Sequence, residues 1–301
     1  MKNLKEPIIY YNGKFLKESE VSLSPYNRGI HFGDGVFETL RVYSGRVFRL
    51  ESHIKRLFKG LDVLGLENKA DVPVIEEAVK GLICENSLTE AALKIIAFRE
   101  ECPGLDPVPG SKACFLMLPS SFDFKRKKYC EKGISAAIVS IRRNNTSPHA
   151  FIKSLNFLEN ILGRREAHER GFDEAVFLNN HEMVTEGSIS NIFIIKDSVL
   201  FTPPAAAGIL KGITRDVVFE IAETLGIKCC EEYFKTDYML TADEAFMTNS
   251  LMEIMPLREI EGHQLGDTCP GSKTADFMRR YREKVDQEVL GIYESNRCKI
   301  L

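Results

Sequence analysis

Long apolar runs are missing from this sequence of 301 residues. No stretch is long and apolar enough to span a membrane, and residues 1–6 lack the apolar core of a signal peptide. Basic runs are also scarce. The formal net charge is −3, and the one basic cluster, residues 125–128, is more typical of a solvated linker than of a nucleic-acid site. We therefore expect a cytoplasmic protein that binds neither membrane nor nucleic acid.

The sequence also lacks the paired cysteine spacing that zinc sites use. Its eight cysteines stand at positions 84, 102, 114, 130, 229, 230, 269 and 298. Such scattered thiols in a reducing compartment are usually small buried or surface side chains. Cys229 and Cys230 project to opposite faces of an expected strand, which argues against joint ligation of one metal. We expect no metal site.

The length and composition are those of a globular protein with two domains. Apolar residues make up 44% of the chain and charged residues 28%, and 301 residues suffice for two hydrophobic cores. The composition turns polar and basic around residues 119–133, so we place an interdomain linker there. This divides the chain into an N-terminal domain over residues 1–118, a C-terminal domain over residues 134–290 and a tail over residues 291–301.

Strand and helix patterns occur together in both domains, which indicates an α/β (α+β) fold. Asn12-Gly13 between aromatic and β-branched residues predicts a hairpin. Apolar residues at helical spacing follow Glu51, and a helix carrying Leu158 and Ile161 is expected before Gly171. A charged helix from residue 272 to about residue 289 closes the predicted fold.

The stretch from Gly208 to Arg215 is typical of a phosphate-binding loop. Its two glycines, four residues apart, allow a tight turn, and Thr214 stands where a helix N-cap would, ahead of an apolar pattern that continues to Leu225. A helix begun in this way offers backbone N–H groups and the positive end of its dipole to a dianion. An ordinary capped helix after a glycine turn is the alternative, and the loop alone does not decide between the two.

Two ionisable residues have surroundings that suggest chemistry. Lys153 lies among apolar residues at the mouth of an expected helix, where a free ammonium is poorly solvated. Glu186 lies in a turn of small residues between two apolar strands. Taken singly, most lysines are merely solvated and most turn carboxylates are merely exposed.

Five segments together resemble the class IV aminotransferases. These are the fold-type IV pyridoxal-phosphate enzymes, which include branched-chain aminotransferases, D-amino-acid aminotransferases and aminodeoxychorismate lyases. The segments are Phe32–Glu38, Glu51–Leu57, Ile152–Asn156, Val184–Ser188 and Gly208–Arg215. The resemblance covers most of the chain, from about residue 11 to residue 256. It implies a smaller N-terminal α/β domain, a larger C-terminal β-rich domain with helices, pyridoxal 5'-phosphate as cofactor, and a homodimer.

The resemblance implies roles for particular residues. Lys153 would form the Schiff base with the cofactor aldehyde and move the proton between the amino acid's α-carbon and C4′ of the cofactor. Glu186 would pair with the pyridine nitrogen and keep it protonated. The other residues implied at the cofactor are Arg56, Leu210, Gly212, Ile213, Thr214 and Ser250.

Several residues keep two interpretations. Arg142 and Arg143 are both candidates for contact with the cofactor's phenolic oxygen, because the loose spacing to Lys153 does not decide between them. Asn156 and Asn191 either support the site or pack in the core.

The substrate side of the site is the least determined, and its candidate residues are Phe37, Arg99 and Asn249. D-amino-acid enzymes usually have Tyr in place of Phe37 and an Arg-x-His carboxylate trap where this chain has Arg99 followed by two glutamates. Branched-chain enzymes typically have Tyr in place of Phe157. The turn at Asn249 is closer to that of the lyases. Arg99, Lys211 or backbone N–H groups are the candidates for binding the substrate carboxylate.

We therefore predict a pyridoxal-phosphate-dependent aminotransferase of amino-acid metabolism. It would transfer an amino group from an amino acid, with branched-chain amino acids among the candidates, to a 2-oxo acid. The closest alternative is an aminodeoxychorismate lyase that releases pyruvate and 4-aminobenzoate, which Asn249 favours. A non-catalytic phosphate-ligand-binding protein is the third hypothesis, motivated by the incomplete carboxylate trap.

Overall fold

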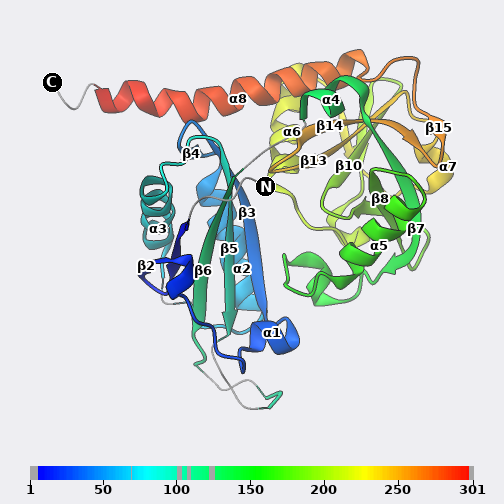
Figure 1. Cartoon of the computed structure of the whole chain (residues 1–301). Helices are drawn as coiled ribbons and strands as arrows, with labels where there is room; N and C mark the ends of the chain where they lie inside the picture. Colours follow the sequence, from blue (N-terminus) through cyan, green and yellow to red (C-terminus); the bar gives the residue numbers. More distant parts are fainter. Residues whose placement is uncertain (1–5, 69, 100–103, 107–109, 122–125, 298–301) are drawn as a thin grey trace. The chain divides into compact units, whose positions relative to one another are not determined.

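The chain folds into two compact units, each of which is described by itself. The computed structural model describes residues 6–68, 70–99, 104–106, 110–121 and 126–297. The first unit comprises Met1–Asp123, Ile152–Asn156 and Asp286–Leu301, and the second comprises Phe124–Phe151 and Phe157–Val285 (Figure 1). Two segments differ from our sequence-based division. The segment that carries Lys153 and the residues from Asp286 onward belong to the first unit.

The first unit is built on a six-stranded antiparallel sheet in the order β2-β1-β6-β5-β3-β4. Its strands are β1 (Ile8–Tyr11), β2 (Lys14–Lys17), β3 (Gly35–Tyr43), β4 (Arg46–Val47), β5 (Ala91–Arg99) and β6 (Ala113–Ser121). The predicted hairpin is confirmed as β1 and β2. Asn12 and Gly13 have φ values of 43° and 90°, which suits the mirror-image turn that joins twisted strands.

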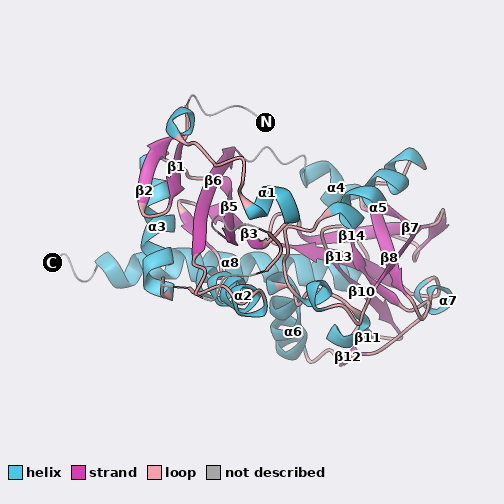
Figure 2. Ribbon diagram, turned by 90° about the horizontal axis from the view of Figure 1, so that it is seen from below, coloured by secondary structure: helices cyan, strands magenta, loops and turns pink. Residues whose placement is uncertain are grey.

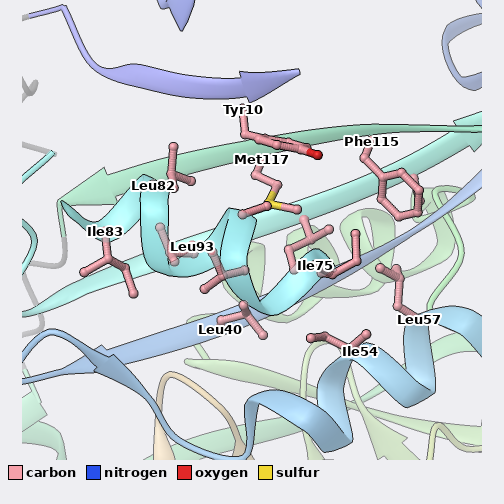
Figure 3. Packing of buried hydrophobic residues seen from close by; sticks show 14 of the residues in the cluster. Tyr10, Leu40, Ile54, Leu57, Ile75, Leu82, Ile83, Leu93, Phe115 and Met117 are labelled. Atoms are coloured by element: carbon pink, nitrogen blue, oxygen red, sulfur yellow. The ribbon is translucent and has the colours of Figure 1, made fainter. Parts of the chain in front are cut away.

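Three helices accompany this sheet: α1 (Arg28–Phe32), α2 (Leu50–Val63) and α3 (Val72–Glu85). Helices α2 and α3 cover one face, where Ile54, Leu57 and Ile75 pack against strand residues such as Leu40 and Leu93 (Figure 3). Burial of one such aliphatic side chain contributes about 1.5–3 kcal/mol. The amphipathic pattern that predicted α2 is therefore the pattern that forms this core.

The alternation of side chains along β3 and β5 assigns each residue to a face. Val36 and Leu40 belong to the core under the helices, so Glu38 lies on that same face. Phe37 lies on the opposite face. Its partner in β5 is Ile96, and Lys94 pairs with Thr39, two residues along the same face.

The second unit contains a nine-stranded mixed sheet. Its strands are β7 (Ile134–Arg143), β8 (Glu174–Asn179), β9 (Val184–Gly187), β10 (Asn191–Lys196), β11 (Val199–Thr202), β12 (Cys229–Glu231), β13 (Glu244–Asn249), β14 (Glu253–Ile260) and β15 (His263–Gln264). The strand order is β12-β11-β10-β13-β14-β7-β8-β9, with β15 paired to β14 beside this path. Strand β9 also pairs with β10. The strands from β10 through β13, β14, β7 and β8 to β9 therefore close into a ring. The closing pair is Glu186 opposite Asn191.

Several helices accompany this sheet. They are α4 (Arg126–Lys132), α5 (Leu158–Glu169), α6 (Ile213–Leu225), α7 (Thr236–Met239) and the long α8 (Ser272–Arg297). Helix α5 packs against β7 and β8 (Figure 2). An aromatic cluster joins α6 and α8 to β10 and β13. Phe193 is stacked on Phe246 at 5.1 Å, Phe219 lies 6.0 Å from Phe193, and Phe277 lies 5.5 Å from Phe246.

Four local predictions need correction. Part of the predicted linker is regular structure: β6 reaches Ser121 and α4 begins at Arg126, in a segment of good helix formers. The closing helix continues to Arg297. Leu158 and Ile161 are 65% and 57% exposed, so they are not the buried stripe of α5.

The fourth correction concerns the start of α6. The N-cap is Gly212, in an extended conformation, and Thr214 is the second residue of the helix. A glycine is needed at the cap because a Cβ atom on Gly212 would overlap Oδ1 of Asn191. Among the described residues, no helix is both long enough and apolar enough to cross a membrane.

Candidate functional site

Lys153 is fixed alongside the start of β3. Its carbonyl oxygen accepts a hydrogen bond from Phe37 N at 2.8 Å, and Leu155 N donates to Gly35 O at 3.0 Å. Gly35 allows this close approach, because a Cβ atom there would lie 2.7 Å from Cδ1 of Leu155 and 2.6 Å from the carbonyl oxygen of Ala97. The backbone around Lys153 is therefore held on both sides by the strand.

The side chain of Lys153 lies over an aromatic ring that a second lysine also contacts. Lys153 Nζ is 4.4 Å from the centroid of the Phe37 ring, and Lys94 Nζ is 4.5 Å from the same centroid. The separation of the two nitrogens thus cannot exceed the sum of these distances. Burial lowers the pKa of Lys94. No carboxylate of the described residues forms an ion pair with Lys94.

Sequence reasoning missed Lys94. The signal was present in the alternation of β5, since Lys94 is an even-numbered residue on the same face as Ile96 and Phe37. A lysine among apolar strand residues predicts an exposed interruption, and Lys94 is indeed exposed. Its place beside Phe37 follows only from the register of β3 and β5.

Arg99, which we predicted as a candidate for the substrate carboxylate, lies on the other face of the sheet. Its Nε pairs with Asp34 at 2.9 Å and its Nη2 donates to the carbonyl oxygen of Leu64 at 2.7 Å. Arg28 pairs with the same Asp34 oxygen at 2.8 Å. Since Phe37 faces away from this cluster, we no longer assign Arg99 to the substrate.

Arg56 belongs to a buried cluster with Glu38 and His53. Its Nε and Nη2 donate to the two carboxylate oxygens of Glu38 at 2.7 and 2.8 Å. Nδ1 of His53 lies 2.8 Å from Glu38 Oε2. This forked pairing holds one edge of the Arg56 guanidinium in a fixed plane.

The ionisation of this cluster follows from burial and charge. Burial alone would raise the pKa of Glu38, but the Arg56 charge and the hydrogen bonds from Arg56 and His53 outweigh it and hold that pKa far below its usual range. Burial lowers the pKa of His53, and the charges of Arg56 and Lys153 lower it further, against the opposing effect of Glu38. The cluster thus holds an ionised carboxylate and a neutral imidazole.

In the second unit, Glu186 lies at the closing point of the strand ring. Its Oε2 accepts a hydrogen bond from Leu210 N at 3.0 Å and from Nδ2 of Asn191 at 3.3 Å. Asn191 also donates to the carbonyl oxygen of Leu210 at 2.8 Å. The Glu186 carboxylate is therefore anchored to the loop from Gly208 to Arg215.

That loop has the geometry of an anion site. Gly208 has a φ of 95°, which only glycine adopts at low cost. The first hydrogen bond within α6 runs from Asp216 N to Gly212 O at 3.0 Å, so the N–H groups of Ile213 and Thr214 have no acceptor within the helix. The side chain of Thr214 is buried beside them.

The structure distinguishes Arg143 from Arg142. The Arg142 guanidinium forms a half-exposed pair with Glu182 at 2.8 Å. That of Arg143 is buried, lies 4.2 Å from the Phe177 ring, and places Nη2 3.9 Å from Glu186 Oε1. Only Arg143 therefore reaches the carboxylate implied at the cofactor.

Asn249 stabilises its own turn. Its Oδ1 accepts hydrogen bonds from Leu251 N and Met252 N at 2.9 and 2.7 Å, and its Nδ2 donates to Ile189 O at 3.0 Å. Both ends of the amide are thus used within the protein. Ser250 follows in the same turn and is half-buried.

Two candidate positions remain, Asn156 and Lys211. Asn156 donates to Gly33 O at 3.1 Å and to Oγ of Ser154 at 2.9 Å, so it supports the segment that carries Lys153. Lys211 is exposed on the loop between Leu210 and Gly212.

The chain is similar to known aminotransferases. The family described as amino-transferase class IV matches residues 35–260. A putative branched-chain-amino-acid aminotransferase of Methanocaldococcus jannaschii is 36% identical over 281 residues, covering 91% of this chain and 95% of that protein. A D-alanine aminotransferase of Staphylococcus epidermidis is 31% identical, covering 92% and 97%.

The fold matches solved structures as well. The branched-chain amino acid aminotransferase from Thermobaculum terrenum, solved in its PLP-form, superposes with a TM-score of 0.85 at 25% identity, covering 93% of this chain and 94% of that one. The expected α/β fold-type IV class is thereby confirmed.

Proposed function

Because the chain belongs to the class IV aminotransferases, we propose that Lys153 is its catalytic lysine and that Glu186 and the loop from Gly208 to Arg215 hold its cofactor. The protein is a pyridoxal-phosphate-dependent aminotransferase. The observation that carries the residue assignment is the hydrogen bond from Leu210 N to Glu186, which joins two features that the sequence singled out separately.

The residues present fit pyridoxal 5'-phosphate. A carboxylate anchored by two donors suits a protonated pyridine nitrogen, and helix N–H groups without an intrahelical acceptor suit a phosphate dianion. Gly212 packs so closely on Asn191 that a Cβ atom has no room, which keeps the backbone of the loop in this conformation. The cofactor supplies an electron sink for the cleaved C–H bond.

Each residue then has a separate task. Lys153 would hold the cofactor through Nζ and, once freed by the substrate amine, would carry the proton from the substrate α-carbon to C4′ of the cofactor. Glu186 would keep the pyridine nitrogen protonated. Five further residues are proposed to bind the phosphate or line the cofactor: Arg56, Leu210, Ile213, Thr214 and Ser250. Arg143 is proposed near the phenolic oxygen.

The substrates are an amino acid and a 2-oxo acid. We propose that Lys94 binds a substrate carboxylate, because it is an ammonium above the same Phe37 ring as Lys153 and has no ion-pair partner among the described carboxylates. The Phe37 ring that both lysines contact offers an apolar contact to an aliphatic side chain, which supports branched-chain amino acids among the donors.

We also propose that the enzyme is cytoplasmic and a homodimer. The resemblance to the family supports the dimer, and exposed apolar side chains such as Leu158 and Ile161 provide surface for a partner. Light scattering on purified protein measures the molar mass. A value equal to one chain contradicts the dimer.

The lyase alternative loses its supporting feature. Asn249 suggested it from sequence, and the three hydrogen bonds of its side chain account for an asparagine at this position without any substrate. The relatives described above are aminotransferases.

The test is a set of half-reactions. The purified protein is loaded with pyridoxal 5'-phosphate and mixed with single amino acids of either hand, without an acceptor. Donors convert the bound cofactor to its amine form, which the absorption spectrum records, and adding a 2-oxo acid restores the original spectrum. Acceptor-independent pyruvate release from aminodeoxychorismate contradicts transamination. A borohydride-reducible adduct at the same site in Lys153→Ala contradicts the assignment of the lysine.

The role of Lys94 has its own test. Lys94→Met is expected to raise KM for 2-oxo acids by about 2- to 5-fold, since the lost ion pair involves an exposed ammonium. Lys94→Arg is expected to restore part of the loss. Lys59→Met, at an exposed position on α2, is the matched control. An unchanged KM in Lys94→Met contradicts the proposal.

A further inference from the structure

Asn160, on α5, forms hydrogen bonds to two parts of the Glu186 site at once. Its Oδ1 accepts from Nη1 of Arg143 at 3.1 Å, and its Nδ2 donates to the carbonyl oxygen of Ser188 at 2.6 Å. Ser188 lies two residues after Glu186. One amide group therefore connects the arginine near Glu186 to the turn that follows Glu186.

Apart from its hydrogen bond to Asn160, the buried Arg143 guanidinium has few hydrogen-bond acceptors. Its Nη1 also donates to Glu159 at 3.2 Å, but Nε and Nη2 are buried and form no hydrogen bond within the described part of the chain. Nη2 lies 3.9 Å from Glu186 Oε1, just beyond hydrogen-bonding distance. A small movement of the guanidinium would close this gap. The hydrogen bonds from Arg143 to Glu159 and Asn160 of α5 oppose that movement.

The turn after Glu186 is held from other directions as well. Ser188 N donates to Oε1 of the buried Glu174 at 3.2 Å, and Glu174 pairs with Arg164 of α5 at 2.9 Å. Nδ2 of Asn249 donates to Ile189 O on the same turn. Arg164 also donates to Oγ of Ser188 at 3.2 Å. Asn160 differs from Glu174, Arg164 and Asn249 because its hydrogen bonds join the turn to Arg143.

We propose that Asn160 is a positioning residue that fixes the separation between Arg143 and Glu186. The inference rests on the proposed role of Glu186 toward the pyridine nitrogen. An amide suits this task because it carries an acceptor and a donor on one rigid plane, whereas a carboxylate lacks the donor and an aliphatic side chain lacks both.

The separation has a chemical consequence. A closer approach of Arg143 would place its Nη2 in a direct hydrogen bond with Oε1 of Glu186. Asn160 keeps the Arg143 guanidinium beside Glu186, yet bonded to α5. Without Asn160, Arg143 moves to Glu186 and competes with the pyridinium for the carboxylate.

Three variants test this positioning role. Asn160→Leu removes both hydrogen bonds, Asn160→Asp keeps the acceptor for Arg143 and loses the donor to Ser188, and Arg165→Ala is the control at an exposed position of α5. The dissociation constant of pyridoxal 5'-phosphate, the pH dependence of the absorption of the bound cofactor, and thermal unfolding of the cofactor-free protein are measured for each.

Asn160→Leu is expected to weaken cofactor binding by about 10-fold and to shift the pH dependence of the spectrum, with a smaller effect in Asn160→Asp. Arg143→Met in the Asn160→Leu background is expected to restore part of the lost affinity, because it removes the guanidinium that competes for Glu186. Equal affinity and spectrum in wild type and Asn160→Leu overturn the proposal, even if the unfolding temperature falls. If the wild type itself shows no cofactor spectrum, the proposed function fails instead, and additive unfolding effects of Asn160 and Arg143 in the cofactor-free protein then overturn the positioning role.

Discussion

Glu186 Oε2 accepts a hydrogen bond from the backbone N–H of Leu210 at 3.0 Å. This single contact ties the carboxylate proposed for the pyridine nitrogen to the loop proposed for the phosphate. The two are separated by 24 residues in sequence. Their mutual position is therefore set by the strand ring, in which Glu186 is opposite Asn191, and by the Asn191 side chain that bonds to both.

Glu186→Gln is expected to bind the cofactor and to lose turnover by about 100-fold or more. The glutamine oxygen still accepts from Leu210 N, so the loop keeps its anchor, but a neutral amide no longer holds the pyridine nitrogen protonated. The measurement is kcat beside the cofactor dissociation constant. Loss of binding with unchanged kcat at saturating cofactor contradicts the assignment.

Gly212→Ala is expected to lower cofactor affinity at a cost of about 1–3 kcal/mol. The new Cβ atom overlaps Oδ1 of Asn191, which must turn and release either Leu210 or Glu186. Titration of the cofactor-free protein with pyridoxal 5'-phosphate gives the affinity. Gly291→Ala is the matched control, because no atom lies within 4 Å of its added Cβ, and it is expected to bind as wild type.

The buried His53 makes stability depend on pH. Burial lowers its folded-state pKa below the ordinary value of 6.5, so the unfolded chain binds this proton more tightly than the folded chain. The stabilisation is complete above that ordinary value and decreases as the pH falls below it. Glu38, whose folded pKa is also lowered, adds a second loss at more acid pH.

Urea unfolding across the pH range measures this effect. His53→Gln keeps a donor for Glu38 but does not titrate, so its stability is expected to stay level between about pH 7 and pH 5 where that of the wild type falls. The mutant curve is compared with that of His263→Gln, at an exposed position. A wild-type curve that is flat in this range contradicts a buried neutral imidazole.

The sequence predicted the parts of the fold that local patterns determine. The Asn12-Gly13 hairpin, the apolar stripe of α2 and the glycine loop before α6 were all identified, because turn chemistry and helical periodicity act over a few residues. The five motif segments also indicated the family, since their order and residue types together are specific even where each one is common.

Contacts between distant segments could not be predicted in this way. The face on which Arg99 lies depends on the register of β5 against β3. A shift of one residue would move Arg99 to the face of Phe37 and Lys94 to the opposite face. The roles of Asn160 and Asn249 depend on turns that only the closed strand ring brings together. The N-cap at Gly212 depends on the nearby Asn191 side chain, so the Thr214 signal alone was misleading.

Single replacements of Arg143 and Arg142 distinguish the roles of two arginines between which the sequence did not decide. Arg143→Gln is expected to reduce kcat/KM by about 10-fold or more, because a buried charge 3.9 Å from Glu186 is lost. Arg142→Gln breaks a half-exposed pair with Glu182 and hydrogen bonds to the carbonyl oxygens of Val139 and Ser140, and it is expected to leave kcat/KM close to that of the wild type. Similar losses of kcat/KM in the two variants contradict this distinction.

Asn249→Ala distinguishes a turn role from a substrate role. The variant leaves Leu251 N and Met252 N without their acceptor and Ile189 O without its donor, so it is expected to destabilise the fold by about 1–3 kcal/mol. Asn249→Asp keeps the acceptor and is expected to lose less. Neither variant is expected to change the KM ratio between different amino acids, because the amide is fully used within the protein. A selective rise in KM for one substrate at unchanged stability would mean that Asn249 touches that substrate. In that case the hydrogen bonds of the turn must rearrange during turnover.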